Sequence, residues 1–298
     1  MLIKNFKWLM IGKWWRIIQF NQIYLFEILK LKKQNLPAQC FFDNSINSYK
    51  PLWSYVFEKY KKDVFMFYYS TNLENIKFKS EINTLEHNYF HLHSWQNYIV
   101  WDLYQKEYIK KYIKIDSNFI IAGYIDFYDL IPFNPIPKKK YIAVFDVSPF
   151  REFYLSNICN NNQYYNYINI RKLILDIYNI ANDLNIEIYH KPKKIIDKGY
   201  KSFFKTNKKY IKFINELKTK KNYKFIPPSY SSYDVIIKSS LVISIPYTST
   251  SLIAKLNNIK CIYYDPTGKL LENHKISHGI KLINNYDLLK KYIIKSFL

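Results

Sequence analysis

The sequence predicts an α/β protein in which parallel strands alternate with helices. Short β-branched apolar runs indicate buried strands, and stretches with apolar residues three and four positions apart indicate helices. The clearest helical spacing spans residues 170–184. The run 241–245 is an uninterrupted apolar strand apart from Ser244, so we expect it at the centre of a parallel sheet.

The second half of the chain carries the sharper pattern. We expect strands at 141–147, 186–189, 224–226, 241–245, 260–264 and 279–283, and helices at 170–184, 203–220, 233–238, 252–256 and 286–297. Pro246 ends the strand 241–245 because proline cannot donate to a ladder. Four hydroxyl residues, 248–251, then precede a helix at the edge where parallel sheets bind anions. Capping of that helix alone would also explain the hydroxyls.

The first half repeats the pattern more weakly. Strands are expected at 63–69, 88–92 and 118–123, and a helix capped by Ser94 is expected at 94–113. The proline- and lysine-rich stretch 130–140 is the expected linker. The chain is therefore expected to comprise a basic, aromatic N-terminal helix (1–34), an α/β lobe (35–137) and a second α/β lobe (138–298).

Residues 1–34 place Trp8, Trp14 and Trp15 among lysines and an arginine. The longest uncharged run, 17–26, is far shorter than the roughly 20 residues of a membrane span. No small-residue cleavage site follows, so we do not expect a secretory signal. Two alternatives stay open, namely an interfacial helix on an anionic membrane surface and a helix packed on its own domain. Lys4 and Lys13 would lie on opposite faces of an ideal helix, which makes the amphipathicity poor.

Composition narrows the function classes. Lys and Arg total 45 against 23 Asp and Glu, a net charge of +22 that attracts nucleic acid, acidic membranes or phosphate-bearing substrates. Codon bias toward lysine and asparagine would give the same excess, and no RNP-like, zinc-finger or helix-turn-helix signature supports nucleic acid. The 5 glycines are scattered singly, which excludes phosphate-binding loops and GxGxxG. The 3 distant cysteines suit a reducing cytoplasm rather than a disulfide framework or zinc site.

The segment 244–249, SIPYTS, resembles the signature of the polysaccharide-biosynthesis PFTS motif proteins, with Tyr247 in place of Phe. A strand before it, the strand end IYYDP after it and a Lys-Pro-Lys segment upstream strengthen the resemblance, which is close over residues 140–270 and loose in the N-terminal half. That family is similar to GT-B glycosyltransferases. The resemblance implies two Rossmann-like lobes, the N-terminal one reduced, and metal-independent sugar transfer from a nucleotide-sugar to a surface polysaccharide or lipid-linked glycan. An inactive member that binds carbohydrate or nucleotide is the alternative, and a nucleic-acid-binding protein is the less favoured one.

The expected donor site combines two segments that follow strands of the C-terminal lobe. Basic residues after the strand 186–189 and the hydroxyl turn would hold the donor phosphates: His190, Lys191, Lys193, Thr248, Ser249, Thr250 and Ser251. Tyr230 and Asp265 are expected on the nucleotide side. The base that takes the acceptor proton is expected among His93, His91 and Asp126. No metal site or cofactor is expected, since Asp-x-Asp is lacking. We expect a cytoplasmic protein; contact with the inner face of the membrane is the alternative that residues 1–34 leave open.

Overall fold

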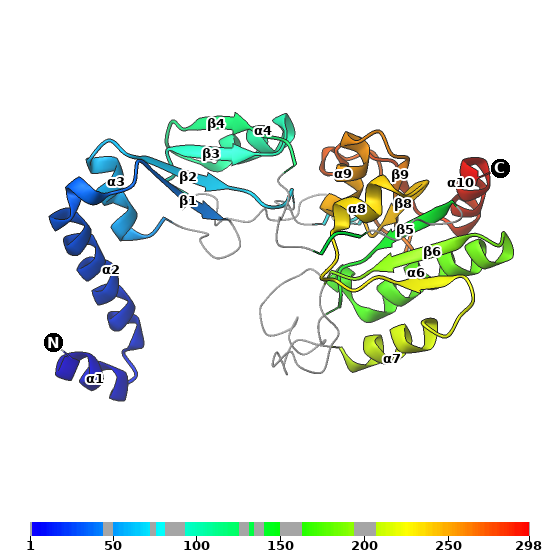
Figure 1. The fold of residues 1–298 in the computed structure, drawn as a ribbon, viewed down its shortest axis with the longest axis horizontal. Coiled ribbons are helices and arrows are strands. Elements are labelled where there is room, and N and C mark those ends of the chain that lie inside the picture. Colours follow the sequence, from blue (N-terminus) through cyan, green and yellow to red (C-terminus); the bar gives the residue numbers. More distant parts are fainter. Residues whose placement is uncertain are drawn as a thin grey trace. The chain divides into compact units, whose positions relative to one another are not determined.

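The computed structural model describes residues 2–43, 50–71, 76–80, 93–124, 131–133, 140–149, 163–193 and 207–297. They form two compact units, each built on its own parallel sheet (Figure 1). Unit 1 comprises residues 1–71 and 87–125, and unit 2 comprises residues 72–86 and 126–298. Parallel sheets flanked by helices confirm the predicted α/β class.

Unit 2 contains a 6-stranded parallel sheet of order β10-β9-β8-β5-β6-β7. Its strands are β5 (Tyr141–Phe145), β6 (Glu187–Lys191), β7 (Tyr223–Phe225), β8 (Leu241–Ser244), β9 (Cys261–Tyr264) and β10 (Leu282–Ile283). From β5 the chain adds β6 and β7 on one side, then returns and adds β8, β9 and β10 on the other. This is the doubly wound order whose ligands bind at the reversal point. The reversal lies between β5 and β8, and the predicted central place of β8 is confirmed.

Helices cover both faces of this sheet, as Figure 1 shows. They are α6 (Tyr167–Asp183), α7 (Lys208–Leu217), α8 (Ser232–Ile237), α9 (Ser249–Leu256) and α10 (Tyr286–Phe297), with short 3-10 turns η4 (Gln163–Tyr165) and η5 (Lys275–Ser277). α6 packs with α7 and α10, whereas α8 packs with α9. The apolar residues that predict α6 form its buried side, because their spacing gathers them on one face.

The register of the sheet assigns side chains to its two faces. Phe145 pairs with Lys191 on one side and Ser244 on the other, so these three residues share a face. Ser244 contacts Ser251 of α9, which identifies this face as the one under α8 and α9. The residues one position earlier in each strand, which include His190 of β6, point to the opposite face.

Unit 1 contains a 4-stranded parallel sheet of order β1-β2-β3-β4. Its elements are β1 (Gln39–Asp43), η2 (Leu52–Ser54), α3 (Tyr55–Lys59), β2 (Asp63–Phe67), β3 (Asn97–Val100), α4 (Leu103–Tyr112) and β4 (Asn118–Ile121). Large aromatic side chains build the core, with Trp95 and Tyr98 both inaccessible to solvent. The rings of Phe42 and Trp95 lie 4.9 Å apart, within the range of favourable aromatic pairs.

The predicted helix 94–113 is wrong in its first part, where the structure has strand β3. Tyr98, Ile99 and Val100 are aromatic or β-branched residues that favour strands, and their burial in the sheet outweighs their near-helical spacing. The helix begins after Asp102, whose side chain accepts from the Gln105 amide at 2.8 Å. Strand β1 was not predicted, and the predicted strand 88–92 lies outside the described residues.

The N-terminal segment forms two helices rather than the expected one, α1 (Leu2–Met10) and α2 (Trp14–Leu31), followed by η1 (Lys33–Asn35). Gly12 ends α1 in the left-handed region at φ 71°, which glycine adopts without strain. The Lys13 amide donates to the Trp8 carbonyl at 2.8 Å and the Gly12 amide to the Leu9 carbonyl at 3.0 Å, a Schellman motif. In the described part of the chain, every helix is too short or too polar to cross a membrane.

Two segments outside the predicted C-terminal lobe are part of unit 2. Phe78 forms an antiparallel bridge with Leu270, and Ile131 forms a parallel bridge with Tyr230. The Phe133 amide also donates to Asp234 at 2.9 Å. Residues 131–133 of the expected linker are therefore anchored on the sheet layer of unit 2, while 134–139 lie outside the described residues.

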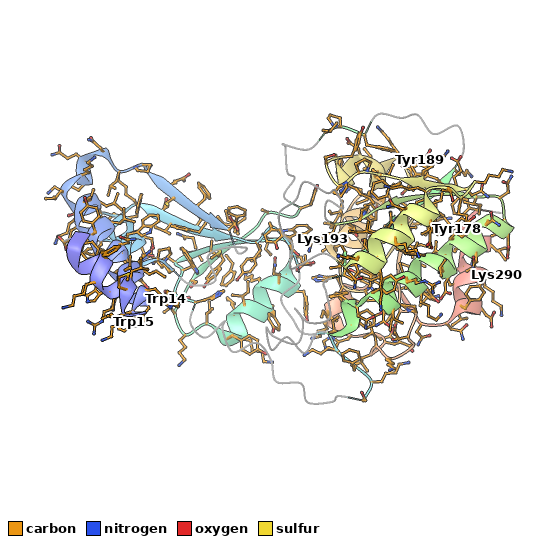
Figure 2. The ribbon with its side chains drawn as sticks, turned by 90° about the horizontal axis from the view of Figure 1, so that it is seen from below. Trp14, Trp15, Tyr178, Tyr189, Lys193 and Lys290 are labelled. Atoms are coloured by element: carbon orange, nitrogen blue, oxygen red, sulfur yellow. The ribbon has the colours of Figure 1, made fainter. Side chains whose placement is uncertain are left out.

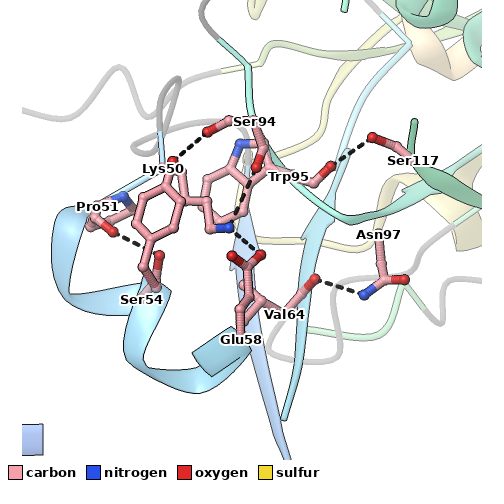
Figure 3. Close-up of polar contacts among 10 residues, drawn as sticks. Lys50, Pro51, Ser54, Glu58, Val64, Ser94, Trp95, Asn97 and Ser117 are labelled. Carbon is pink, nitrogen blue, oxygen red and sulfur yellow. Dashed lines mark hydrogen bonds and ion pairs between the residues drawn. The ribbon is translucent and has the colours of Figure 1, made fainter. Parts of the chain in front are cut away.

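A buried ion pair ties together the loops of unit 1 (Figure 3). The Lys50 ammonium contacts the Glu58 carboxylate, and their side chains are only 1% and 12% exposed. Lys50 also donates to the Ser94 carbonyl at 3.4 Å and lies 4.0 Å from the centre of the Tyr55 ring. Burial lowers the pKa of Lys50, and Glu58 opposes that shift. The pair joins α3 to the segment before β3.

Replacing Lys50 by Met should destabilise unit 1 by about 3–5 kcal/mol, because the Glu58 carboxylate is left buried without its partner. The double variant Lys50→Met/Glu58→Leu should recover most of that loss. Urea unfolding followed by tryptophan fluorescence reports on unit 1 alone, since all 6 tryptophans lie in it.

Lys30→Ala is the matched control, because Lys30 forms an exposed pair with Glu27 at 3.2 Å. It should cost less than about 1 kcal/mol. A Lys50→Met loss no larger than that of Lys30→Ala would contradict a structural role for the buried pair.

Candidate functional site

The reversal point of the unit 2 sheet places two loop starts side by side at its carboxyl edge. β5 runs into Asp146, and β8 runs into the turn 245–248 and then α9. In open α/β sheets this edge is where ligands bind, and a helix that begins here directs its free amides and positive dipole end outward. The segment that resembles a family signature, 244–249, is this turn.

A network of hydroxyl groups fixes the turn to the sheet. The Ser244 hydroxyl lies 2.6 Å from that of Ser251 and accepts from Thr248 at 3.0 Å. The single Thr248 proton is shared with the Ile245 carbonyl, also at 3.0 Å, and Ser251 donates to the Ile262 carbonyl at 3.3 Å. All three hydroxyl residues are buried. They join β8, the turn, α9 and β9 through satisfied hydrogen bonds, which makes the turn rigid.

Thr248 is the N-cap of α9, yet in the described part of the chain its side chain makes no capping hydrogen bond. Asn166, Asn207 and Ser231 do cap α6, α7 and α8. Because the Thr248 hydroxyl turns back to the sheet, it does not satisfy the first-turn amides of α9. Ser249 and Thr250 in that turn are half-exposed, and the Thr250 hydroxyl lies 3.3 Å from that of Thr248. An anionic group that approaches the first-turn amides would therefore meet these hydroxyls as well.

Tyr247 adopts a left-handed backbone conformation at φ 63°, which is costly for a bulky residue. Its ring is buried and meets that of Tyr263 edge-on at 5.9 Å, and its hydroxyl donates to the Leu271 carbonyl at 3.3 Å. These contacts hold the strained turn in place. Backbone strain of this kind concentrates at functional sites.

Two more tyrosines hold the carbonyl groups of the turn. Tyr165, which precedes α6, donates to Pro246 at 2.9 Å, and Tyr263 of β9 donates to Thr248 at 2.9 Å. Burial raises the pKa of both phenols far above neutral, so each stays a proton donor. The shape of the turn thus depends on side chains from three elements.

His190 is buried on the other face of the sheet. Its Nε2 lies 3.2 Å from the Asp146 carboxylate and its Nδ1 2.6 Å from the Tyr223 hydroxyl. Tyr210 donates to the same Asp146 oxygen at 2.5 Å. All four side chains are buried, and together they tie the end of β5 to β6, β7 and α7. In this arrangement His190 orients the strand ends and does not face the α9 side.

Lys191 points to the face that carries α8 and α9. Its ammonium donates to the Pro228 carbonyl at 3.1 Å, and the residue is 6% exposed. Burial lowers the pKa of Lys191 to about 8, although Asp146 acts in the opposite direction. Lys193, two positions further along the chain, is exposed. Lys191 and the start of α9 therefore share a face and an edge, separated by the width of β5.

The two expected nucleotide-side residues differ in exposure. Tyr230 is half-buried, with its ring edge-on to Phe133 at 6.0 Å. Asp265 is fully buried and accepts from Tyr164 at 2.7 Å, from the Thr267 amide and hydroxyl at 2.9 and 2.7 Å, and from the Leu270 amide at 2.9 Å. Asp265 therefore shapes the loop after β9.

Of the expected bases, His93 is 4% exposed in unit 1. Its Nδ1 lies 3.4 Å from the Tyr68 hydroxyl and its ring stacks on Tyr98. Burial lowers the pKa of His93 to about 4, which leaves it neutral at pH 7 and a weak base. His91 and Asp126 lie outside the described residues.

Sequence reasoning missed two residues that organise the edge. Ser244 is the hub of the hydroxyl network, and its signal was a lone hydroxyl inside a buried apolar strand. Asp146 contacts both Tyr210 and His190, and its signal was a carboxylate directly after the central strand β5. Buried polar groups need partners, so either residue could have been singled out.

The structure defines an α/β protein whose second unit is doubly wound, with the start of α9 at the reversal point of its sheet. The chain belongs to the polysaccharide biosynthesis PFTS motif family, whose pattern matches residues 4–293. Comparison with curated protein sequences gave no match.

Solved structures with a similar arrangement include glycosyltransferases. The structure of TarM matches with a TM-score of 0.46 at 10% identity, over 92% of this chain and 51% of that one. The UDP-GlcNAc 2-epimerase of Methanocaldococcus jannaschii gives 0.48 at 13%, over 92% and 72%. The pneumococcal O-GlcNAc transferase GtfA gives 0.44 at 9%, over 93% and 51%. The chain thus spans about half the length of TarM and GtfA.

Replacing Tyr247 by Phe, the residue of the family signature, should cost no more than about 1 kcal/mol, because only the hydrogen bond to Leu271 is lost. Tyr247→Gly relieves about 1–2 kcal/mol of left-handed strain but removes a buried ring worth about 3–5 kcal/mol. Tyr247→Val loses most of the buried ring and also keeps the left-handed strain, which is worse for a β-branched residue. Chemical unfolding followed by circular dichroism should rank the variants Phe, Gly, Val; a glycine variant more stable than the phenylalanine one would contradict the packing role.

Proposed function

We propose that this protein is a glycosyltransferase that transfers a sugar from a nucleotide-sugar to a surface polysaccharide or a lipid-linked glycan. The observation that carries the proposal is the α9 N-terminus, whose cap hydroxyl is turned away at the reversal point of the sheet. Membership of a polysaccharide biosynthesis family supplies the biological setting. Two lobes of the GT-B kind would then bind donor in unit 2 and acceptor in unit 1.

Sugar transfer requires a binding site, here called the cradle, that stabilises the nucleoside diphosphate as it leaves. The amides at the start of α9, with the hydroxyls of Ser249 and Thr250, would bind phosphate oxygens. Lys191 and Lys193 would neutralise the charge that develops on the leaving group. His190, Thr248 and Ser251 are buried and hydrogen-bonded, so in this proposal they hold the cradle in shape. The half-buried ring of Tyr230 would contact the nucleotide, whereas Asp265 would act indirectly by shaping the loop after β9.

Transfer also requires a base for the acceptor hydroxyl. Because His93 is buried and weakly basic, we propose His91 and Asp126 ahead of it for this role. A lipid-linked acceptor would bring the protein to the anionic inner face of the membrane. The burial of His93 also favours one alternative, a family member that binds the nucleotide-sugar without turning it over.

The pKa of Lys191 gives the donor site a characteristic pH response. Below pH 8 the lysine is largely protonated and attracts phosphate; as pH rises through 8 it loses its proton, and affinity falls. An ordinary lysine would keep its charge up to about pH 10. Anion binding favours the protonated form, so binding near pH 8 should take up a proton.

Lys191→Ala should weaken binding of nucleoside diphosphates by about tenfold or more, because a charge-assisted hydrogen bond is lost. Calorimetry with UDP, GDP and CDP should show wild-type affinity falling between pH 7 and 9, and Lys191→Arg should abolish this fall. Lys208→Ala, at an exposed position on α7, is the matched control and should bind like wild type.

Equal affinity of Lys191→Ala and wild type would refute the donor site. Release of nucleoside diphosphate from nucleotide-sugars, in the presence of a glycan acceptor, then separates the transferase from the binding protein. Binding without turnover under all these conditions would favour the alternative.

A further inference from the structure

The surface of α1 and α2, here called the N-terminal helix pair, exposes an unusual concentration of large apolar side chains. Met10 is 71% exposed, Phe6 64% and Trp14 61%. The others are Leu9, Ile11, Trp15, Ile18, Ile23, Tyr24, Leu25 and Leu31. The 18-residue α2 has no buried residue. A surface helix normally buries one apolar stripe, so this pair lacks the cover that its composition requires.

The pair is anchored to unit 1, and the described residues of that unit leave its apolar side chains exposed. α2 packs on η2 and α3, and α1 packs on α2. Figure 1 shows α1 at the end of α2 that lies away from α3. The Schellman motif at Gly12 fixes the turn between the two helices, so the apolar groups are presented by a defined structure.

The positive charge of the N-terminal helix pair favours an anionic binding partner. Basic residues are interspersed with the apolar ones and include Lys7, Lys13, Arg16, Lys30, Lys32 and Lys33, whereas Glu27 is the single acidic residue in 1–35. The Arg16 guanidinium lies 5.7 Å from the Trp8 ring centre and 5.2 Å from that of Trp15. Figure 2 shows Trp14 and Trp15 together on α2. Tryptophan beside lysine and arginine is the composition that occupies the headgroup level of a bilayer.

We propose that the N-terminal helix pair docks into the surface of an anionic lipid bilayer, with Trp14, Trp15 and Ile18 inserted and Lys13 and Arg16 on the lipid phosphates. The helices lie in the interface, since neither is long and apolar enough to span. The inference deepens the proposed function, because a lipid-linked acceptor lies at a membrane. It can be tested without donor or acceptor, so either proposal can fail while the other holds.

The test is cosedimentation of the full chain with vesicles of phosphatidylglycerol and phosphatidylcholine, or of phosphatidylcholine alone. Wild type should bind the anionic vesicles far better, and binding should weaken as salt rises from about 0.1 M to 1 M, which shortens the screening length. Trp14→Ala/Trp15→Ala and Lys13→Glu/Arg16→Glu should each lower the partition coefficient by about tenfold or more.

Matched controls change equally exposed residues elsewhere. Leu103→Ala/Ile168→Ala removes apolar groups that are 60% and 68% exposed, and Lys208→Glu/Lys212→Glu reverses charges on α7. Both should bind like wild type, as should Lys191→Ala. Fluorescence of the remaining tryptophans checks that each variant is folded.

Equal vesicle binding by the helix-pair variants, or an equal loss in the controls, would overturn the proposal. It would also be overturned if light scattering showed a wild-type dimer that Trp14→Ala/Trp15→Ala dissociates, because a second copy would then cover the helices.

Discussion

The hydrogen bonds of Ser244 are the constraint on which the candidate site depends. This hydroxyl sits at the end of a central strand, accepts from Thr248 and pairs with Ser251 of the following helix. Because Thr248 is drawn to the sheet, it is lost as a cap for α9. One buried serine therefore links the rigid joint between strand and helix to the proposed role of the α9 start in binding an anion.

Contacts with the surrounding residues offset the backbone strain of that joint. Tyr247 occupies a strained conformation, but its buried ring and the hydroxyls of Tyr165 and Tyr263 fix the turn from the neighbouring layers. On the other face, Asp146, His190, Tyr210 and Tyr223 lock the ends of β5 and β6. Tyrosines hold the reversal point on both faces of the sheet, because each combines a large buried ring with a hydroxyl that donates a hydrogen bond.

Much of unit 2 could be predicted because its strands are buried on both faces and its longest helix shows strict spacing, as in 170–184. The strands and helices of unit 1 were harder to predict from the sequence. Tyr98 and Trp101 recur at near-helical spacing, and only the sheet decides that Asn97–Val100 is a strand. The candidate site was predicted from its hydroxyls and lysines, but the opposite orientations of His190 and Lys191 were not, because these two residues are adjacent in the chain and point to opposite faces of the sheet. Alternation decides it once the strand is known.

The proposed donor site places the phosphates at the start of α9. Amide hydrogen exchange by NMR, with and without saturating UDP, can detect phosphate bound there. We predict slowed exchange at Ser249, Thr250 and Ser251, with little change at the capped start of α8, where Ser231 already satisfies an amide. Unchanged exchange in α9 with UDP bound, or slowing confined to other parts of the chain, would contradict it.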